Sequence, residues 1–282
     1  TNRERQSVPR VPVDTASLKS PDVKPQVTWI GHSTVLFQMG GKTVITDPVF
    51  SDRCSPVSFA GPKRYQKPAL TVAELPQVDF AVISHNHYDH LDKASVLALG
   101  EGVHWLVPLG VKSWFTDLGI KNVTELDWWE EITIGDVRFV ATPTQHWSAR
   151  GVLDRFDTLW ASWLVEVQGV RFWFGGDTGY NPVQFKEIGE RFAPIDLAAI
   201  PIGAYEPRWF MKDSHVNPEE AVQIAIDLKT PSSFGMHWGT FILTDEPVLE
   251  PPARLKETLK EQNLAPDFFI SPKPGEILQL TK

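Results

Sequence analysis

The residue types best suited to chemistry in this sequence are imidazoles and carboxylates that come directly after short apolar segments. Seven such side chains follow four of these segments: His85, His87, Asp89, His90, His146, Asp177 and His237. Neutral imidazole and carboxylate are the groups with which proteins bind Zn²⁺ and similar ions, at about 2.0–2.2 Å. Packed together without a cation, the same groups would be buried with poor partners, which costs free energy. The pattern therefore predicts a metal site.

The spacing inside the first cluster suits two ions rather than one. His85 and His87 are two residues apart on an extended segment, so both can point toward one ion. Asp89 and His90 follow where the chain turns into the next helix, and they can face a second ion. A carboxylate has two oxygens, so Asp177 can bridge both ions. Zinc, iron and manganese all suit imidazole and carboxylate ligands.

Short apolar runs alternate with helical stretches along most of the chain, and these elements must bring the seven side chains together. We expect strands at 27–39, 42–46, 78–83, 104–108, 137–142, 160–167, 170–174, 197–202, 233–236 and 267–270. We expect helices at 93–99, 111–118, 183–191, 218–228 and 252–262. Sites in layered α/β proteins gather beyond the strand ends, where loops converge. The predicted fold class is α/β, with two packed mixed sheets flanked by helices.

The chain of 282 residues is long enough to bury a full-sized core. Residues 1–25 contain prolines at 9, 12, 21 and 25, and we expect them to form an extended strap before a single domain at 26–282. The proline-containing stretch 51–77 is expected to be a long loop, which in a compact domain is often functional. The eleven tryptophans are interpreted first as core residues and second as the lining of an apolar groove or as contacts with lipid headgroups.

Composition argues against several classes of protein. The net charge of −8 argues against a broad nucleic-acid-binding surface. No apolar run approaches the ~18 residues that a membrane-spanning helix requires. The one cysteine, Cys54, cannot form a disulfide within the chain, which fits a reducing compartment. The polar start lacks a signal peptide, so we expect a cytoplasmic or peripherally membrane-associated protein; because it does not begin with Met, an exported form stays open.

Several motifs resemble those of a known family. The run His85-x-His87-x-Asp89-His90, with His146, Asp177 and His237 downstream, resembles the metallo-β-lactamase fold superfamily. Within that superfamily the chain looks like the N-acyl-phosphatidylethanolamine-hydrolysing phospholipase D (NAPE-PLD) group. The matching stretches include Trp29-Ile30-Gly31-His32-Ser33-Thr34-Val35, Thr46-Asp47-Pro48-Val49-Phe50, Gly176-Asp177-Thr178-Gly179-Tyr180, His215-Val216-x-Pro218-Glu219-Glu220-Ala221 and His237-Trp238-Gly239-Thr240-Phe241.

This resemblance implies an αββα sandwich with two zinc ions at its edge. By the family pattern, one ion is held by His85, His87 and His146, and the other by Asp89, His90 and His237. Asp177 bridges the two ions, and the catalytic residues are Asp89, Asp177 and His215. Classical β-lactamases of this fold have a Cys ligand where this chain has Asp177, and Cys54 lies upstream of the motif. We therefore do not expect β-lactam hydrolysis as the native activity.

Two adjacent cations can hold a bridging hydroxide at neutral pH. In the reaction that the resemblance implies, this hydroxide attacks phosphorus in line, N-acylethanolamine leaves and phosphatidic acid remains. His215 is expected to donate the proton to the leaving group or to contact the phosphate, because it precedes a helix N-terminus. The alternative is a loop histidine packed on Trp209.

Further residues are candidates for supporting roles. Asp47 is expected to orient a ligand imidazole, and its alternative is a simple turn-forming aspartate. His32 can approach the site or be buried for structural reasons. Arg208, near Trp209, can bind the phosphodiester or form a surface salt bridge. His104, inside an apolar strand, is expected to be structural.

Three functions stay open at this point. The first is a phosphodiesterase that acts on N-acylated phospholipids or a related diester. The second is hydrolysis of a lactone or ester at the same site, and the third is a non-catalytic metal-binding module. Release of N-acylethanolamine, compared with lactone opening, separates the first two. The expected partners are a phospholipid substrate, a membrane surface in peripheral contact and a second copy in a homodimer, and no nucleic acid.

Overall fold

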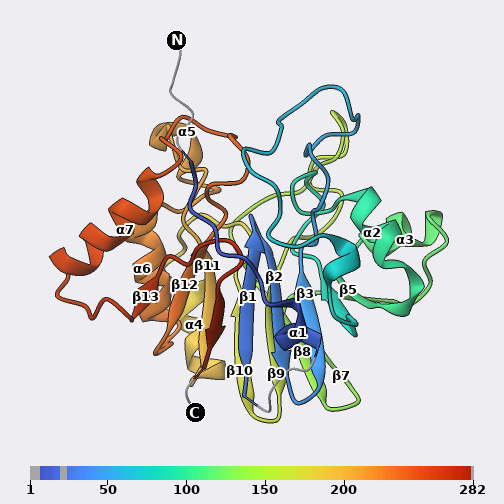
Figure 1. Ribbon diagram of the computed structural model, residues 1–282, viewed down its shortest axis with the longest axis horizontal. Helices are drawn as coiled ribbons and strands as arrows, with labels where there is room; N and C mark the ends of the chain where they lie inside the picture. Colours follow the sequence, from blue (N-terminus) through green and yellow to red (C-terminus); the bar gives the residue numbers. More distant parts are fainter. Residues whose placement is uncertain (1–6, 20–23, 281–282) are drawn as a thin grey trace.

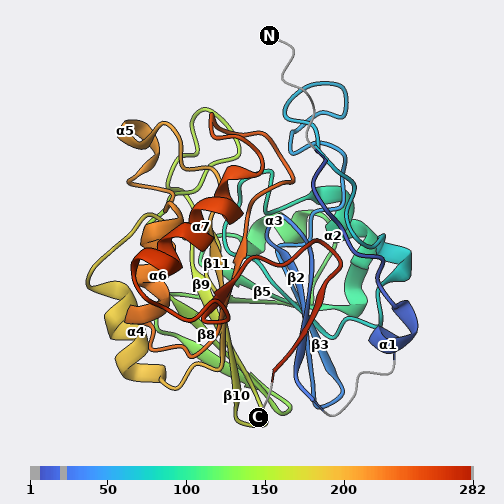
Figure 2. The same ribbon diagram turned by 60° about the vertical axis from the view of Figure 1, so that its left-hand side comes forward.

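The computed structural model describes residues 7–19 and 24–280. Two seven-stranded sheets pack face to face, and helices cover the outside of each (Figure 1, Figure 2). This arrangement confirms the predicted α/β sandwich of two mixed sheets. No helix within the described residues is long and apolar enough to cross a membrane.

The first sheet has the strand order β14-β1-β2-β3-β4-β5-β6. Its strands are β1 (Gln26–Gly31), β2 (Thr34–Met39), β3 (Lys42–Thr46), β4 (Phe80–Val82), β5 (His104–Pro108), β6 (Val123–Leu126) and β14 (Ile277–Gln279). The pairs β14–β1, β1–β2 and β2–β3 are antiparallel, and the pairs from β3 to β6 are parallel. A parallel pair needs a crossover, and the helices α2 (Lys93–Leu99) and α3 (Lys112–Asp117) lie in those crossovers.

The second sheet has the strand order β13-β12-β11-β10-β9-β8-β7. Its strands are β7 (Glu131–Ile134), β8 (Val137–Thr142), β9 (Ser162–Val167), β10 (Val170–Phe174), β11 (Leu197–Pro201), β12 (Ser233–Met236) and β13 (Phe269–Ile270). The strands β7 to β10 are antiparallel, and β10 to β13 are parallel. The helices α4 (Gln184–Phe192), α6 (Pro218–Asp227) and α7 (Glu250–Glu261) cover this sheet, on the side of the molecule opposite α2 and α3 (Figure 1).

The core between the sheets is rich in aromatic side chains. Phe37 of the first sheet stacks on Phe172 of the second with 5.0 Å between ring centroids, and Phe80 contacts Phe139 at the same distance. A second cluster lies between the first sheet and its helices, where Trp105 packs on Phe115 of α3. Four tryptophans are fully buried, which agrees with the interpretation of tryptophan as a core residue: Trp29, Trp105, Trp163 and Trp173.

The helix α6 begins as its sequence predicts. The side chain of Asn217 accepts a hydrogen bond from the backbone N–H of Glu220, and the Glu220 carboxylate accepts one from the N–H of Asn217. Pro218 occupies the first turn, where its missing N–H costs nothing. This capping box places the residues just before the helix, including His215, at a defined position beside the second sheet.

Two predicted elements differ from the structure. The segment predicted as one strand at 27–39 is the hairpin β1–β2, because the chain turns at Gly31 and His32, both at positive φ (136° and 54°). The strap was expected to be extended, but its residues Thr15–Lys19 form the short helix α1, and residues 1–6 and 20–23 lie outside the described part. The Asp14 side chain caps this helix at Ala16, and Leu18 is buried against the first sheet.

Candidate metal centre

The seven side chains singled out above lie together at one edge of the sandwich, although they come from four separate loops. The strands β10, β11 and β12 run parallel, so Asp177 and His237 emerge from the same edge of the second sheet. The loop after β4 of the first sheet meets them there, and the N–H of Ala161 donates to the Ser84 carbonyl at 2.8 Å to join the sheets.

Three imidazoles form a first group. The Nδ1 atom of His87 lies 2.9 Å from Nε2 of His85 and 3.3 Å from Nε2 of His146. The other ring nitrogen of His85 and of His146, Nδ1, has a hydrogen-bond acceptor in each case. Nδ1 of His146 donates to the Ser214 carbonyl at 2.9 Å, and Nδ1 of His85 faces the Ser84 hydroxyl oxygen at 2.8 Å. With their protons held on Nδ1, His85 and His146 present Nε2 lone pairs to His87. Converging lone pairs are the arrangement that binds a cation.

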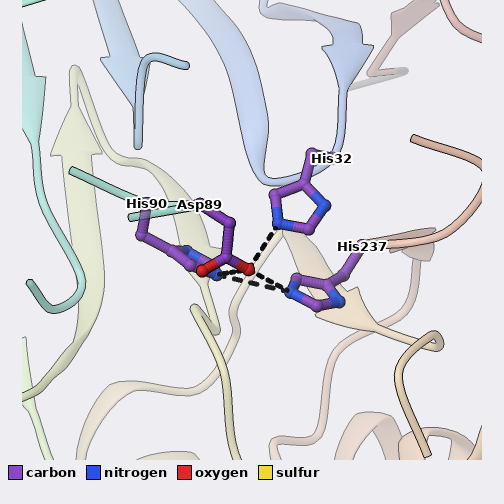
Figure 3. Close-up of side chains that lie close together, drawn as sticks. All are labelled: His32, Asp89, His90 and His237. Carbon is purple, nitrogen blue, oxygen red and sulfur yellow. Dashed lines mark hydrogen bonds and ion pairs between the residues drawn. The ribbon is translucent and has the colours of Figure 1, made fainter. Parts of the chain in front are cut away.

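Asp89, His90 and His237 form a second group, and His32 lies within ligand distance of the same three side chains (Figure 3). The Nε2 atoms of His90 and His237 are 3.3 Å apart, and Oδ2 of Asp89 lies 3.4 Å from the first and 3.6 Å from the second. The other ring nitrogen of His90, Nδ1, donates to Oδ2 of Asp47 at 2.6 Å. This hydrogen bond leaves the Nε2 lone pair of His90 directed at the group.

The carboxylate of Asp177 lies between the two groups. Its Oδ2 atom is 3.1 Å from Nε2 of His90, 3.9 Å from Nε2 of His146 and 4.0 Å from Nε2 of His85. Its Oδ1 atom is 3.1 Å from Nε2 of His237. Oδ1 is buried, and its contact with His237 lacks the geometry of a regular hydrogen bond. The donor set thus fits two cations that share this carboxylate.

Burial and charge set the protonation of the site. Burial is the main cause that holds the pKa of His85 and that of His146 well below the usual value. Burial also opposes ionisation of Asp177, but the imidazoles of His237 and His90 outweigh it and keep the pKa of this carboxylate low. In turn, burial disfavours protonation of His237, yet the Asp177 carboxylate raises its pKa to about 9. The buried carboxylates therefore favour positive charge in their midst, which divalent cations supply.

Asp47 serves two of the imidazoles at once, one directly and one through Ser84. The Asp47 carboxylate accepts from the backbone N–H of Ser84 at 2.7 Å and from its hydroxyl at 2.5 Å, in addition to the bond from His90. Because the Ser84 hydroxyl donates its one proton to Asp47, it must accept from Nδ1 of His85. A single buried carboxylate thereby selects the tautomers of His85 and His90, which belong to different groups.

The remaining candidates lie around this centre. Nε2 of His215 is 3.9 Å from Oδ2 of Asp177, and its ring contacts those of His146 and His237, whereas Trp209 packs on Phe210. His32 lies 3.0 Å from Asp89.

Arg208 forms the salt bridge that was the alternative to phosphate binding. Its Nη2 atom donates to both carboxylate oxygens of Glu220, at 3.0 and 2.8 Å, and its Nη1 atom donates to the His215 carbonyl. His104 is hydrogen-bonded to Thr124 at 2.7 Å, in agreement with a structural role. Cys54 is a buried free cysteine.

Two residues of the centre were not predicted from the sequence. Ser84 directly precedes the histidine motif, and its position was the only signal available. Arg150 donates from Nη1 to the carbonyls of Asn86 and Leu91, both at 2.8 Å, and lies 4.0 Å from the ring centroid of Tyr88. Arg150 thus binds the loop after His146 to the loop that carries the histidine motif. No local sequence pattern predicts this contact.

Comparison with known proteins gives a consistent assignment. Residues 42–238 match the model of the β-lactamase superfamily domain. The chain is 46% identical to N-acyl-phosphatidylethanolamine-hydrolyzing phospholipase D 1 of Caenorhabditis elegans, over 89% of this chain and 74% of that protein. It is 39% identical to the mitochondrial protein of the same name in Saccharomyces cerevisiae, over 88% of this chain and 54% of that protein.

Solved structures show the same fold at low sequence identity. Igni18, a metallo hydrolase from Ignicoccus hospitalis, superposes with a TM-score of 0.67 at 19% identity and covers 92% of this chain and 99% of its own. An isothiocyanate hydrolase from Delia radicum gut bacteria superposes with a TM-score of 0.70 at 20% identity, and the match covers 90% of this chain and 98% of that one. The chain is therefore a metallo-hydrolase that belongs to the β-lactamase superfamily and, within it, to the NAPE-PLD family.

Proposed function

We propose that the protein is a phospholipase D-type phosphodiesterase with a dinuclear metal centre. One ion would be held by His85, His87 and His146, and the other by Asp89, His90 and His237. The observation that carries this proposal is the position of the Asp177 carboxylate. Both of its oxygens lie 3.1 Å from second-group imidazoles, and Oδ2 also lies 3.9 Å and 4.0 Å from His146 and His85 of the first group. Divalent ions in such a site supply Lewis acidity and lower the pKa of water toward about 7.

The proposed substrate is N-acyl-phosphatidylethanolamine or a related phosphodiester, as the names of the two relatives suggest. Water adds to phosphorus, the bond from phosphorus to the ethanolamine oxygen breaks, and phosphatidic acid and N-acylethanolamine result. The leaving oxygen takes up one proton. His215 is the proposed contact to the phosphodiester or donor of that proton, and its Nδ1 atom, buried without a hydrogen-bond partner among the described residues, supports this role. The N-terminus of α6 begins three residues later and favours an anion nearby.

Exposed apolar side chains around the centre support a lipid substrate. Trp209 and Phe210 of α5 (Arg208–Met211) are 80% and 68% exposed, and Val152 and Leu153, a few residues after His146, are each 96% exposed. The loops after His146, His237 and Asp47 and the helix α5 lie along the same edge in both views (Figure 1, Figure 2).

Clusters of exposed apolar side chains often mark surfaces that bind proteins or membranes, and aromatic rings suit the boundary between lipid headgroups and chains. The cations Arg155 and Lys212 are exposed in the same two segments, as are the carboxylates Asp157 and Asp213. We therefore propose that this edge rests on the membrane surface that contains the substrate.

The experiment is an assay of purified, metal-loaded protein on vesicles that contain N-acyl-phosphatidylethanolamine, in water enriched with ¹⁸O. We expect N-acylethanolamine to be released and the label to appear in phosphatidic acid, because the attack is at phosphorus. Asp177→Asn is the control for contaminating lipases. Loss of all phosphodiester hydrolysis together with efficient opening of a lactone would overturn the proposal and favour the ester-hydrolase alternative.

A further inference from the structure

His32 is a buried imidazole at the centre that the proposed function does not use. It lies in the turn between β1 and β2 and is 1% exposed. Its Nε2 atom is 3.0 Å from Oδ2 of Asp89, and Figure 3 shows the ring directed at that carboxylate from the side opposite His90. Its ring centroid is 4.0 Å from that of His237.

The direction of this hydrogen bond follows from the chemistry of its two partners. A carboxylate is an acceptor only, so Nε2 of His32 carries the proton and donates it to Asp89. The other ring nitrogen, Nδ1, is buried and has no hydrogen-bond partner among the described residues. A nitrogen that carries a proton has no lone pair for a metal ion. The hydrogen bond to Asp89 is thus the one polar interaction that explains a histidine here.

The backbone holds His32 in place at a cost. Its φ of 54° lies in the left-handed region, which is unfavourable for a residue other than glycine. Three hydrogen bonds keep it there: its N–H donates to Oγ1 of Thr240 at 2.8 Å, and its carbonyl accepts from the His237 N–H at 3.0 Å and from Nε1 of Trp29 at 2.8 Å. The same turn therefore fixes His32 relative to His237.

The Asp89 oxygen that His32 contacts, Oδ2, is also the oxygen that faces the other two residues of the second group. Oδ2 of Asp89 lies 3.4 Å from Nε2 of His90 and 3.6 Å from Nε2 of His237. The Asp89 side chain is 15% exposed, so without His32 its carboxylate has room to rotate toward solvent. A hydrogen bond from His32 removes that freedom.

We propose that His32 is a positioning residue, which donates from Nε2 to Asp89 and holds Oδ2 toward His90 and His237 so that the second ion binds tightly. This inference rests on the proposed function, which assigns an ion to Asp89, His90 and His237. Loss of a hydrogen-bond partner behind a metal ligand typically lowers metal affinity 10–100-fold. Because His32 does not contact the first group, the affinity for the first ion should change little.

Two substitutions separate the hydrogen bond from the shape of the ring. His32→Gln keeps an N–H donor close to the position of Nε2, and His32→Phe keeps the ring without a donor. Zinc affinity for each ion is measured by competition with a chromophoric chelator, and the melting temperature of the metal-free protein is measured beside it. We expect His32→Phe to lower the affinity for one of the two ions by about 10–100-fold. We expect His32→Gln to keep most of the wild-type affinity.

A double-mutant cycle tests whether His32 acts through Asp89. In an Asp89→Ala background, which has no acceptor for the His32 N–H, His32→Phe should cause no further loss of affinity for the second ion. Independent losses in the two variants would overturn the inference. So would wild-type affinity in His32→Phe, equal loss of both ions, or a His32→Gln variant as weak as His32→Phe, which would indicate a direct ligand or a packing role.

The wild-type protein distinguishes the two proposals. Two zinc ions bound to the wild type, with unchanged binding in His32→Phe, would leave the proposed function intact and reject the role of His32. A wild type that binds fewer than two ions would reject both.

Discussion

Removal of the Ser84 hydroxyl should weaken the binding of one metal ion more than the binding of the other. Ser84→Ala deletes the group that accepts from Nδ1 of His85 at 2.8 Å and donates to Asp47 at 2.5 Å. The direct bond from His90 to Asp47, at 2.6 Å, stays. The Nδ1–H group of His85 then has no partner in a side chain that is 1% exposed. Its proton can move to Nε2, where it blocks the lone pair that faces His87.

The size of the effect follows from that unpaired group. A buried donor without a partner costs about 1–3 kcal/mol. Since 1.4 kcal/mol corresponds to a factor of ten, the ion that His85 helps to hold should bind roughly 5–150-fold more weakly. The ion held by His90 should change less, because its imidazole keeps the carboxylate of Asp47.

The assay is competition between the protein and a chelator of known zinc affinity, fitted to two binding steps. Ser162→Ala is the matched control: it also removes a buried hydroxyl, but that hydroxyl bonds to Thr142 and to the carbonyl of Pro143 rather than to an imidazole. We expect wild-type affinities in the control. Unchanged affinities in Ser84→Ala, or an equal loss of both ions, would refute the reasoning.

Three other predictions concern the same centre and its edge. Asp177→Asn should reduce metal content by elemental analysis and abolish turnover, because an amide cannot share charge between two ions; full activity would contradict the bridging role. In metal-free protein His237 has a raised pKa of about 9, so it is protonated at pH 7 and must lose that proton to bind an ion. Affinity for the second ion should therefore rise from pH 7 to 9, with proton release in calorimetry; a flat profile would contradict this. The double substitution Trp209→Ala and Phe210→Ala should reduce cosedimentation with vesicles and leave the melting temperature unchanged, because both side chains are mostly exposed; wild-type cosedimentation would reject the membrane edge.

Much of the layered fold and the identity of the central side chains can be predicted from the sequence. Strands such as β8, β10 and β12 are apolar runs with polar ends, so their bounds and the residues that follow them can be identified locally. Shorter strands carry weaker signals. The strands β6 and β7 contain exposed or half-buried residues and no continuous apolar run, and the sequence did not predict them.

The supporting contacts could not be predicted, because they depend on tertiary approach. The turn at His32 is held by Thr240, 208 residues away. Gly31 is a weak local signal for it, and the apolar pattern continues on both sides of this glycine as it would in a single strand. Arg208 had two interpretations that the sequence could not separate, and the nearby Glu220 carboxylate shows which contact it makes. Asp47 was predicted to orient one imidazole. Its second link, to His85 through the Ser84 hydroxyl, depends on how the two loops approach each other and could not be predicted from the sequence.

The most direct test of the dinuclear centre is anomalous diffraction from crystals of the metal-loaded protein, collected at the absorption edge of the bound metal. We expect two peaks about 3.5–4 Å apart, with the Asp177 carboxylate bound to both. One peak should lie among His85, His87 and His146, and the other among Asp89, His90 and His237. A single peak, or a second peak outside these two groups, would contradict the account.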